Sequence, residues 1–138
     1  MTTLGHIYKA GGILLNNRRL LVSKSYGKDI FFAPGGKLEA GETPEEALVR
    51  ELKEELTIAV HKETLSPFGT FTHPVTGDED RTITMHVFIV SSWEGTIAAA
   101  NEIQEVRWVT AEEGSALYMG SIFKEEVIPR LKSQGLLD

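Results

Sequence analysis

The stretch Gly36–Ile58, GKLEAGETPEEALVRELKEELTI, constrains this chain more than any other, because it places several acidic residues at helical spacing behind a glycine-rich loop. Thr43 has the residue type of a helix N-cap, and Pro44 suits the first helical position. Glu46 completes a T-x-x-E capping box with Thr43. These residues predict a helix that begins at Pro44.

The predicted helix has an apolar stripe for the core, formed by Leu48, Leu52 and Leu56. An adjoining stripe is acidic, because offsets of three and four residues share a helical face, and it comprises Glu51, Glu54 and Glu55. Like charges at this spacing destabilise an isolated helix by a few tenths of a kcal/mol per pair. A cation should therefore compensate them, either Arg50 or a bound Mg²⁺, which prefers oxygen ligands. A solvated acidic face is the alternative for such a pattern taken alone.

The stretch resembles the Nudix box, in which glycine, glutamate, an Arg-Glu pair and a Glu-Glu pair stand at fixed spacing. The matching positions in this chain are Gly36, Glu42, Arg50, Glu51, Leu52, Glu54, Glu55 and Ile58. One position differs, because Thr57 stands where the family usually has glycine. A glycine just after a helix suits a left-handed C-cap, so Thr57 concerns the geometry of the turn more than the chemistry.

The resemblance implies a hydrolase that cleaves a diphosphate linkage with Mg²⁺, or with Mn²⁺ as the alternative ion. A metal ion bound to carboxylates would neutralise phosphate oxygens and acidify a water molecule. The implied metal ligands are a backbone carbonyl near Gly35 and the carboxylates of Glu51, Glu54 and Glu55.

The general base implied by the resemblance is Glu51 or Glu102. The segment Asn101–Thr110, NEIQEVRWVT, is similar to the family region that often supplies one more carboxylate, with Glu102 as the closer match and Glu105 as the second. Ordinary exposed glutamates are an equal alternative there. The remaining box residues are expected to support the site, with Arg50 orienting the carboxylates and Glu42 bracing the loop or binding metal in an outer position.

Substrate contacts are expected from the loop and from the strands before it. In similar nucleotide hydrolases a basic residue near Lys24 contacts phosphate, although a solvated lysine at a strand end is an equal interpretation. Gly36 and Lys37, in the PGGK loop, are the next candidates. Phe32 could stack on a base, but Phe31 and Phe32 point to opposite faces of a strand, so at least one of them should be in the core.

The PGGK form of the loop favours the nucleoside triphosphate and oxidised-guanine branch of the family, with 8-oxo-dGTP as a candidate substrate. ADP-ribose is an alternative, because His73-Pro74 lies where some ADP-ribose-cleaving members carry a proline, and dinucleoside polyphosphates are another. A catalytically silent nucleotide-binding module is a further hypothesis. Such a module should have lost box glutamates, and all of them are present here.

Composition limits the other functions. A chain of 138 residues predicts a single domain, 1–138, with a core of its own. The absence of cysteine excludes disulfides and thiolate sites, and a net charge of −6 argues against duplex DNA as a partner. No apolar run is long enough to span a bilayer and the first residues lack a signal-peptide core, so a cytoplasmic protein is expected. Many relatives are dimers, so a homodimer is an open prediction.

The remaining patterns predict the fold. Strand-like runs occupy Ile7–Leu15, Leu20–Lys24, Ile30–Phe32, Ala59–Glu63, Leu65–His73, Arg81–Ser92 and part of Asn101–Thr110, with turns at Asn16–Arg18 and Pro74–Asp80. The run Ser121–Gln134 predicts a second amphipathic helix, which Pro129 could bend and Gly135 ends. Together with the resemblance, this order predicts an α/β/α sandwich with a mixed β-sheet between helices.

Overall fold

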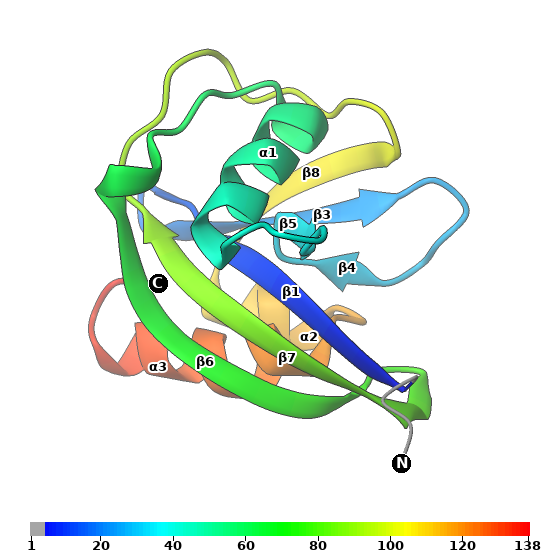
Figure 1. Cartoon of the computed structure of the whole chain (residues 1–138). Helices are drawn as coiled ribbons and strands as arrows, with labels where there is room; N and C mark the ends of the chain where they lie inside the picture. Colours follow the sequence, from blue (N-terminus) through cyan, green and yellow to red (C-terminus); the bar gives the residue numbers. More distant parts are fainter. Residues whose placement is uncertain (1–4) are drawn as a thin grey trace.

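The computed structural model describes residues 5–138 and has helices on both sides of its strands (Figure 1). Figure 1 shows α1 on one side and α2 and α3 on the other. The strands are β1 His6–Ile13, β2 Leu15–Asn16, β3 Arg19–Ser25, β4 Phe31–Phe32, β5 Gly35–Lys37, β6 Leu65–Val75, β7 Asp78–Val90 and β8 Ile103–Val109. The helices are α1 Pro44–Leu56, the 3₁₀ helix η1 Lys62–Thr64, α2 Ala111–Ala116, the π-helical η2 Ile122–Val127 and α3 Ile128–Ser133.

The strands form two sheets. In the first, the order is β5-β1-β7-β6, and β1 runs parallel to β7 while the other neighbours are antiparallel. In the second, β3 pairs antiparallel with β2, β4 and β8. The predicted α/β/α sandwich with a mixed sheet is confirmed, and the sequence did not reveal that an antiparallel sheet stands beside the mixed one.

Of the two predicted turns, the first agrees with the structure and the second is shorter than expected. The turn between β2 and β3 is confirmed, and its residues Asn17 and Arg18 have φ of 51° and 62°, as a two-residue type I′ turn requires. The second turn is much tighter than Pro74–Asp80, because β6 extends to Val75 and β7 begins at Asp78. Gly77 provides the left-handed conformation there, with φ of 85°.

The helix α1 begins as its sequence predicts. The Thr43 side chain accepts a hydrogen bond from the Glu46 amide, and the Glu46 carboxylate accepts one from the Thr43 amide over 3.0 Å. This capping box satisfies two amides that have no partner within the helix. The leucine stripe is fully buried, with Leu48, Leu52 and Leu56 at 0% exposure.

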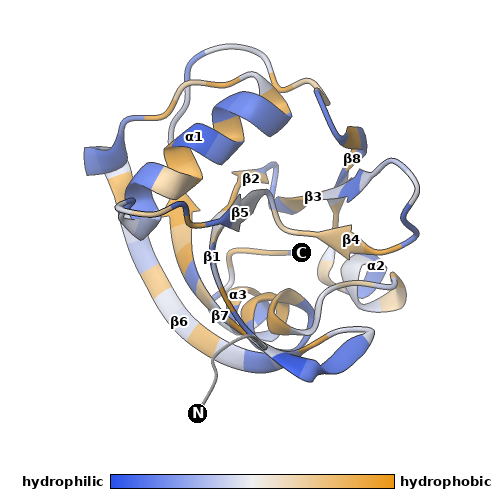
Figure 2. Cartoon of the chain, turned by 45° about the vertical axis from the view of Figure 1, so that its right-hand side comes forward, coloured by the Kyte–Doolittle hydropathy of each residue, from blue (hydrophilic) through white to orange (hydrophobic). Residues whose placement is uncertain are grey.

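Because successive side chains of a strand point to opposite faces, they pack into two cores, one against each helical layer. The core under α1 includes Leu14, Leu21 and Phe88, which pack with the leucine stripe. The other core includes their strand neighbours Ile13, Leu20 and Val87, packed with residues of η2 and α3. Hydrophobic and hydrophilic residues accordingly alternate along α1 and α3 (Figure 2).

The C-terminal segment differs from the single helix expected over Ser121–Gln134. The chain winds as a π-helix over η2 before it becomes α-helical in α3, and Pro129, which has no amide hydrogen to donate to a preceding turn, lies at this change. Gly135 follows the helix with φ of 75°. The separate helix α2 was not expected, although Thr110 and Glu113 form a second capping box. None of the helices in residues 5–138 is both long and apolar enough to cross a membrane.

The C-cap of α1 keeps the left-handed geometry although it carries threonine. Thr57 has φ of 61°, its amide bonds to the Lys53 carbonyl at 3.2 Å, and its hydroxyl donates to the Thr96 carbonyl at 3.0 Å. A β-branched residue is strained in this conformation, and glycine is not. The hydroxyl contact offsets part of that strain.

We expect Thr57→Gly to raise the free energy of unfolding by about 1 kcal/mol, because removing backbone strain outweighs the loss of one exposed hydrogen bond. Thr57→Ala is the matched control, since it loses the hydroxyl and keeps the positive φ, and it should be less stable than the wild type. Urea unfolding of the three proteins measures both changes. A glycine variant no more stable than the alanine variant would contradict the expectation.

Candidate active site

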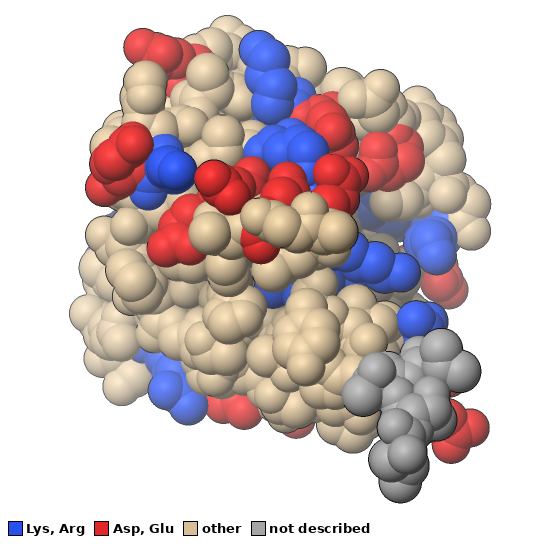
Figure 3. All heavy atoms as spheres, viewed as in Figure 1, with Lys and Arg blue, Asp and Glu red and all other residues tan. Residues whose placement is uncertain are grey.

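A cleft of about 380 Å³ opens between α1, the β1–β5 edge of the first sheet and the β3–β8 part of the second. Its charged lining residues are three glutamates and three lysines: Glu51, Glu55, Glu102, Lys9, Lys28 and Lys37. Figure 3 shows acidic and basic side chains gathered on the face of the molecule that carries α1.

Three carboxylates converge in this cleft. One oxygen from each of Glu51, Glu55 and Glu102 lies within 4.8 Å of the others. Two come from successive turns of α1, and the third comes from the turn before β8. Hard oxygen donors this close together match the preference of Mg²⁺ and Mn²⁺ for carboxylate ligands. The chemistry of the donor set therefore fits a divalent cation.

The fourth candidate carboxylate, Glu54, lies elsewhere on α1. Its side chain is 50% exposed and stands 3.5 Å from Arg50 Nη1. Glu51 and Glu55 are four residues apart and face the cleft together, whereas Glu54 is rotated by about 100° from Glu55 toward solvent. Of the three glutamates expected to share one patch, only Glu51 and Glu55 thus face the cleft. Glu105, the second candidate before β8, also lies outside the cluster and is 3.2 Å from Arg107.

Arg50 joins the loop to the helix through its guanidinium. Its Nε and Nη2 donate to the two carboxylate oxygens of Glu42 over 2.7 and 2.9 Å. Its Nη1 donates to Glu51 over 2.8 Å, and Nη2 also reaches the Lys37 carbonyl over 3.1 Å. The Arg50 hydrogen bonds lower the pKa of Glu42 to about 2. Arg50 therefore fixes the orientation of Glu51, and Glu42 anchors Arg50.

The backbone requires glycine at Gly35, and at Gly36 the lack of a side chain leaves room for the Glu51 carboxylate. A Cβ atom on Gly36 would lie 2.6 Å from the Glu51 carboxyl carbon. Gly35 has φ of 138°, and a Cβ there would lie 2.1 Å from the Ala10 carbonyl oxygen. The Gly35 amide donates to Glu55 over 3.0 Å. The absence of side chains at these positions lets the backbone approach the carboxylates closely. Gly35 contacts the Glu55 carboxylate through its amide.

The electrostatics of the cluster favour protons or cations. Burial, followed by the neighbouring charges of Glu51 and Glu102, raises the pKa of Glu55 to about 8, against the lowering effect of the Gly35 amide. Burial also raises the pKa of Glu51, although Arg50 opposes this shift. Glu55 is only 6% exposed. Two carboxylates this buried and this close resist carrying two negative charges unless a cation joins them.

The basic residues of the cleft are not those that the sequence favoured first. Lys24 lies outside its lining, because Ser23 and Ser25 face the cleft and the residue between them on a strand faces the other way. Its ammonium donates to Gln104 over 2.5 Å and to the Lys28 carbonyl over 3.2 Å. Lys37 does line the cleft, and sequence reasoning missed Lys9 and Lys28.

The phenylalanine pair divides as strand geometry requires. Phe31 is buried in the core at 5% exposure, and Phe32 lines the cleft. Phe32 also lines a small apolar pocket next to the cleft, together with Lys9. A signal for Lys9 was present in the sequence, because it is the one charged residue in the run Ile7–Leu15.

Comparison with known proteins connects this geometry to a family. The model of the NUDIX domain matches residues 5–131. An 8-oxo-dGTP diphosphatase of Proteus vulgaris is 43% identical over 74 residues, which cover 54% of this chain and 62% of that protein. An ADP-ribose pyrophosphatase of Methanocaldococcus jannaschii is 33% identical over 100 residues, covering 71% of this chain and 57% of that protein. These matches span less than two thirds of the length of either relative.

Solved structures agree with the fold. The solution structure of the E. coli ORF135 protein superposes with a TM-score of 0.70 at 27% identity, covering 94% of this chain and 89% of that one.

Without metal, the raised pKa of Glu55 should make folding pH-dependent. The stability linked to this group is fully present below the ordinary pKa of 4.5 and is lost as the pH rises toward 8, because the folded state then has to give up a favoured proton. We expect Glu55→Gln to match the wild type at pH 5 and to exceed it by more than about 1 kcal/mol at pH 9.

Urea unfolding in EDTA at the two pH values measures this difference. Glu105→Gln serves as the control, since it removes an exposed glutamate near the same strand, and it should follow the wild type at both pH values. Identical pH dependence of the wild type and Glu55→Gln would show that the buried carboxyl does not carry the linkage.

Proposed function

Since this chain belongs to the Nudix family, we propose that it hydrolyses a diphosphate linkage in a nucleoside triphosphate, with an oxidised nucleotide such as 8-oxo-dGTP as the first candidate. The observation that carries the proposal is the convergence of Glu51, Glu55 and Glu102 in a cleft that lysines also line. Carboxylates that hold a divalent ion, opposite cations that hold phosphate, suit a substrate with several adjacent phosphates.

The names of the relatives support this choice of substrate. The Proteus protein is named an 8-oxo-dGTP diphosphatase, and a relative in Haemophilus influenzae with 36% identity over 99 residues carries the same name. The second candidate substrate is ADP-ribose, because the Methanocaldococcus relative is named an ADP-ribose pyrophosphatase. Both substrates contain a diphosphate flanked by a nucleoside, so the same cleft chemistry serves either.

Members of this family depend on a divalent metal ion, and we propose Mg²⁺ as the ion used here, with Mn²⁺ as the alternative. The residues that would hold it are Glu51, Glu55 and Glu102, with the carbonyl of Gly35 and the more exposed Glu54 as further ligands. When bound, the ion supplies charge neutralisation at the phosphates and acidifies water. The buried position of Glu55 supports its role as a ligand, because an ion relieves the repulsion within the cluster.

The side chains around the metal site have separate roles in the proposed reaction. Glu55 is the most buried of the three carboxylates and is held by the Gly35 amide, so the more accessible Glu51 or Glu102 is assigned to accept the proton of the attacking water. Arg50 positions Glu51 through a charge-assisted hydrogen bond and is not among the residues that line the cleft. The lysines of the cleft hold phosphate oxygens that face away from the carboxylates.

The test is a screen in which chromatography follows the nucleotide products, with and without Mg²⁺, across canonical nucleoside triphosphates, 8-oxo-dGTP, ADP-ribose and dinucleoside polyphosphates. We expect metal-dependent cleavage that is fastest with 8-oxo-dGTP. In Glu51→Gln, kcat should fall at least about 100-fold, because a group that contacts the metal or the attacking water is lost.

Glu105→Gln removes the same charge outside the cluster and should retain wild-type activity. A screen in which ADP-ribose is cleaved faster than every triphosphate would favour the second candidate. If no compound is cleaved while one binds tightly, the proposal of hydrolysis fails and the chain is a nucleotide-binding module. Full activity of Glu51→Gln would refute the assigned site.

A further inference from the structure

The charged residue Lys9 lies between two cavities that share a wall. It lines the cleft that contains the carboxylates, and it also lines the apolar pocket of about 80 Å³ beside it. Phe32, Ala33 and Met85 belong to both linings as well. Any ligand that extends from the cleft into the apolar pocket therefore passes the Lys9 side chain.

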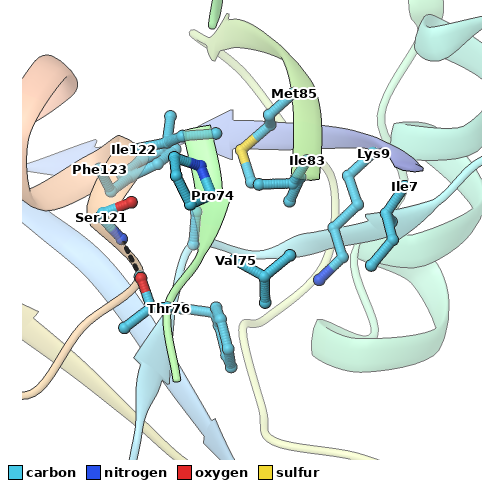
Figure 4. A pocket seen from close by; sticks show the side chains of 13 residues that line it. Ile7, Lys9, Pro74, Val75, Thr76, Ile83, Met85, Ser121, Ile122 and Phe123 are labelled. Carbon is cyan, nitrogen blue, oxygen red and sulfur yellow. Dashed lines mark hydrogen bonds between the residues drawn. The ribbon is translucent and has the colours of Figure 1, made fainter. Parts of the chain in front are cut away.

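The apolar pocket offers no other charged group. Its remaining lining residues among those the structure describes are uncharged, and they include Ile7, Val75, Ile83, Met85 and Phe123, which Figure 4 shows as sticks. Figure 4 also shows Lys9 beside Ile7. An uncharged part of a ligand fits this pocket, and an ionised part does not, because the pocket could not replace its hydration. Lys9 thus marks the boundary between an apolar and a highly charged environment.

The position of Lys9 is unfavourable for the protein alone. Its partner on β5 is Lys37, and like charges that face each other on neighbouring strands destabilise a sheet. Burial, followed by the charges of Lys37 and Lys28, lowers the pKa of Lys9, and the attraction of Glu55 and Glu51 offsets this shift only in part. The Phe32 ring, whose centroid lies 5.1 Å from the Lys9 ammonium, adds a stabilising cation–π contact.

The strand neighbours of Lys9 are also unfavourable for a charged side chain. Lys9 projects from β1 on the side of Ile7 and Ile13, and its neighbour on β7 is Met85, so on these sides its neighbours are apolar. A leucine or methionine would pack at this position without repulsion from Lys37. Lys9 is instead a half-buried cation, and an anion in the cleft would offset its repulsion from Lys37.

We propose that Lys9 binds the phosphate of the substrate that is nearest to its uncharged organic group, and that it thereby selects ligands with an anion at the mouth of the apolar pocket. This inference rests on the proposed function, since it assumes that phosphates occupy the cleft. Lys9 is a binding residue in this scheme. It holds the phosphate through a charge-assisted hydrogen bond, while the carboxylate cluster acts farther along the phosphate chain.

Lys9→Met tests the proposal, because methionine keeps the apolar stem of lysine and removes the charge. Lys132→Met is the matched control, since it removes the same charge from an exposed position on α3, away from the cleft. With 8-oxo-dGTP and Mg²⁺, KM of Lys9→Met should rise about tenfold while kcat changes less than about threefold. Lys9→Arg keeps the charge and should recover part of the loss.

A second measurement does not depend on turnover. In EDTA, calorimetric titration compares 8-oxo-dGMP with 8-oxo-deoxyguanosine, which lacks the phosphate. The wild type and Lys132→Met should bind the monophosphate about tenfold more tightly than the nucleoside, and Lys9→Met should lose this preference while its affinity for the nucleoside is unchanged. Thermal unfolding confirms that each variant is folded.

The two proposals can fail separately. A wild type that hydrolyses none of the compounds refutes the proposed function. In that case the titration still tests whether Lys9 binds the phosphate. If the wild type shows no preference for the monophosphate, or if Lys9→Met keeps that preference, Lys9 does not bind the phosphate. An unchanged KM in Lys9→Met leads to the same rejection.

Discussion

The close approach of Glu51 and Glu55 within a partly buried cleft is the constraint on which the rest of the site depends. Two carboxylates so placed repel each other, and burial strengthens this repulsion because less water screens it. The fold offsets part of the cost through the Gly35 amide on Glu55 and the Arg50 guanidinium on Glu51. The remaining cost is a reason for the protein to bind a cation.

That constraint explains why the loop before α1 has glycines and why the loop is braced. Side chains on Gly35 or Gly36 would collide with Ala10 or Glu51, so the backbone could not reach the carboxylates. Glu42 holds Arg50 with two hydrogen bonds, and Arg50 in turn fixes Glu51. Loop and helix thus form one unit, in which the acidic residues are oriented before any ligand arrives.

The lysines that line the cleft repeat this pattern with the opposite charge. Lysines stand close enough to repel one another, just as the glutamates do, and each group is unfavourable alone. A metal ion would complement the charge of the glutamates, and a chain of phosphates beside it would complement the charge of the lysines. The cost that both groups impose on the free protein is the kind of local conflict expected at a functional site.

Local sequence alone determined α1, its capping box, its leucine stripe and the tight turn at Asn17–Arg18, because hydrogen bonds and dihedral preferences of near neighbours decide these features. Tertiary structure decided which carboxylates meet. Glu102 joins Glu51 and Glu55, and Glu54 turns to solvent, because strand register and helix rotation bring distant segments together. The place of Lys9 opposite Lys37 likewise follows from the pairing of β1 with β5, which no local pattern encodes.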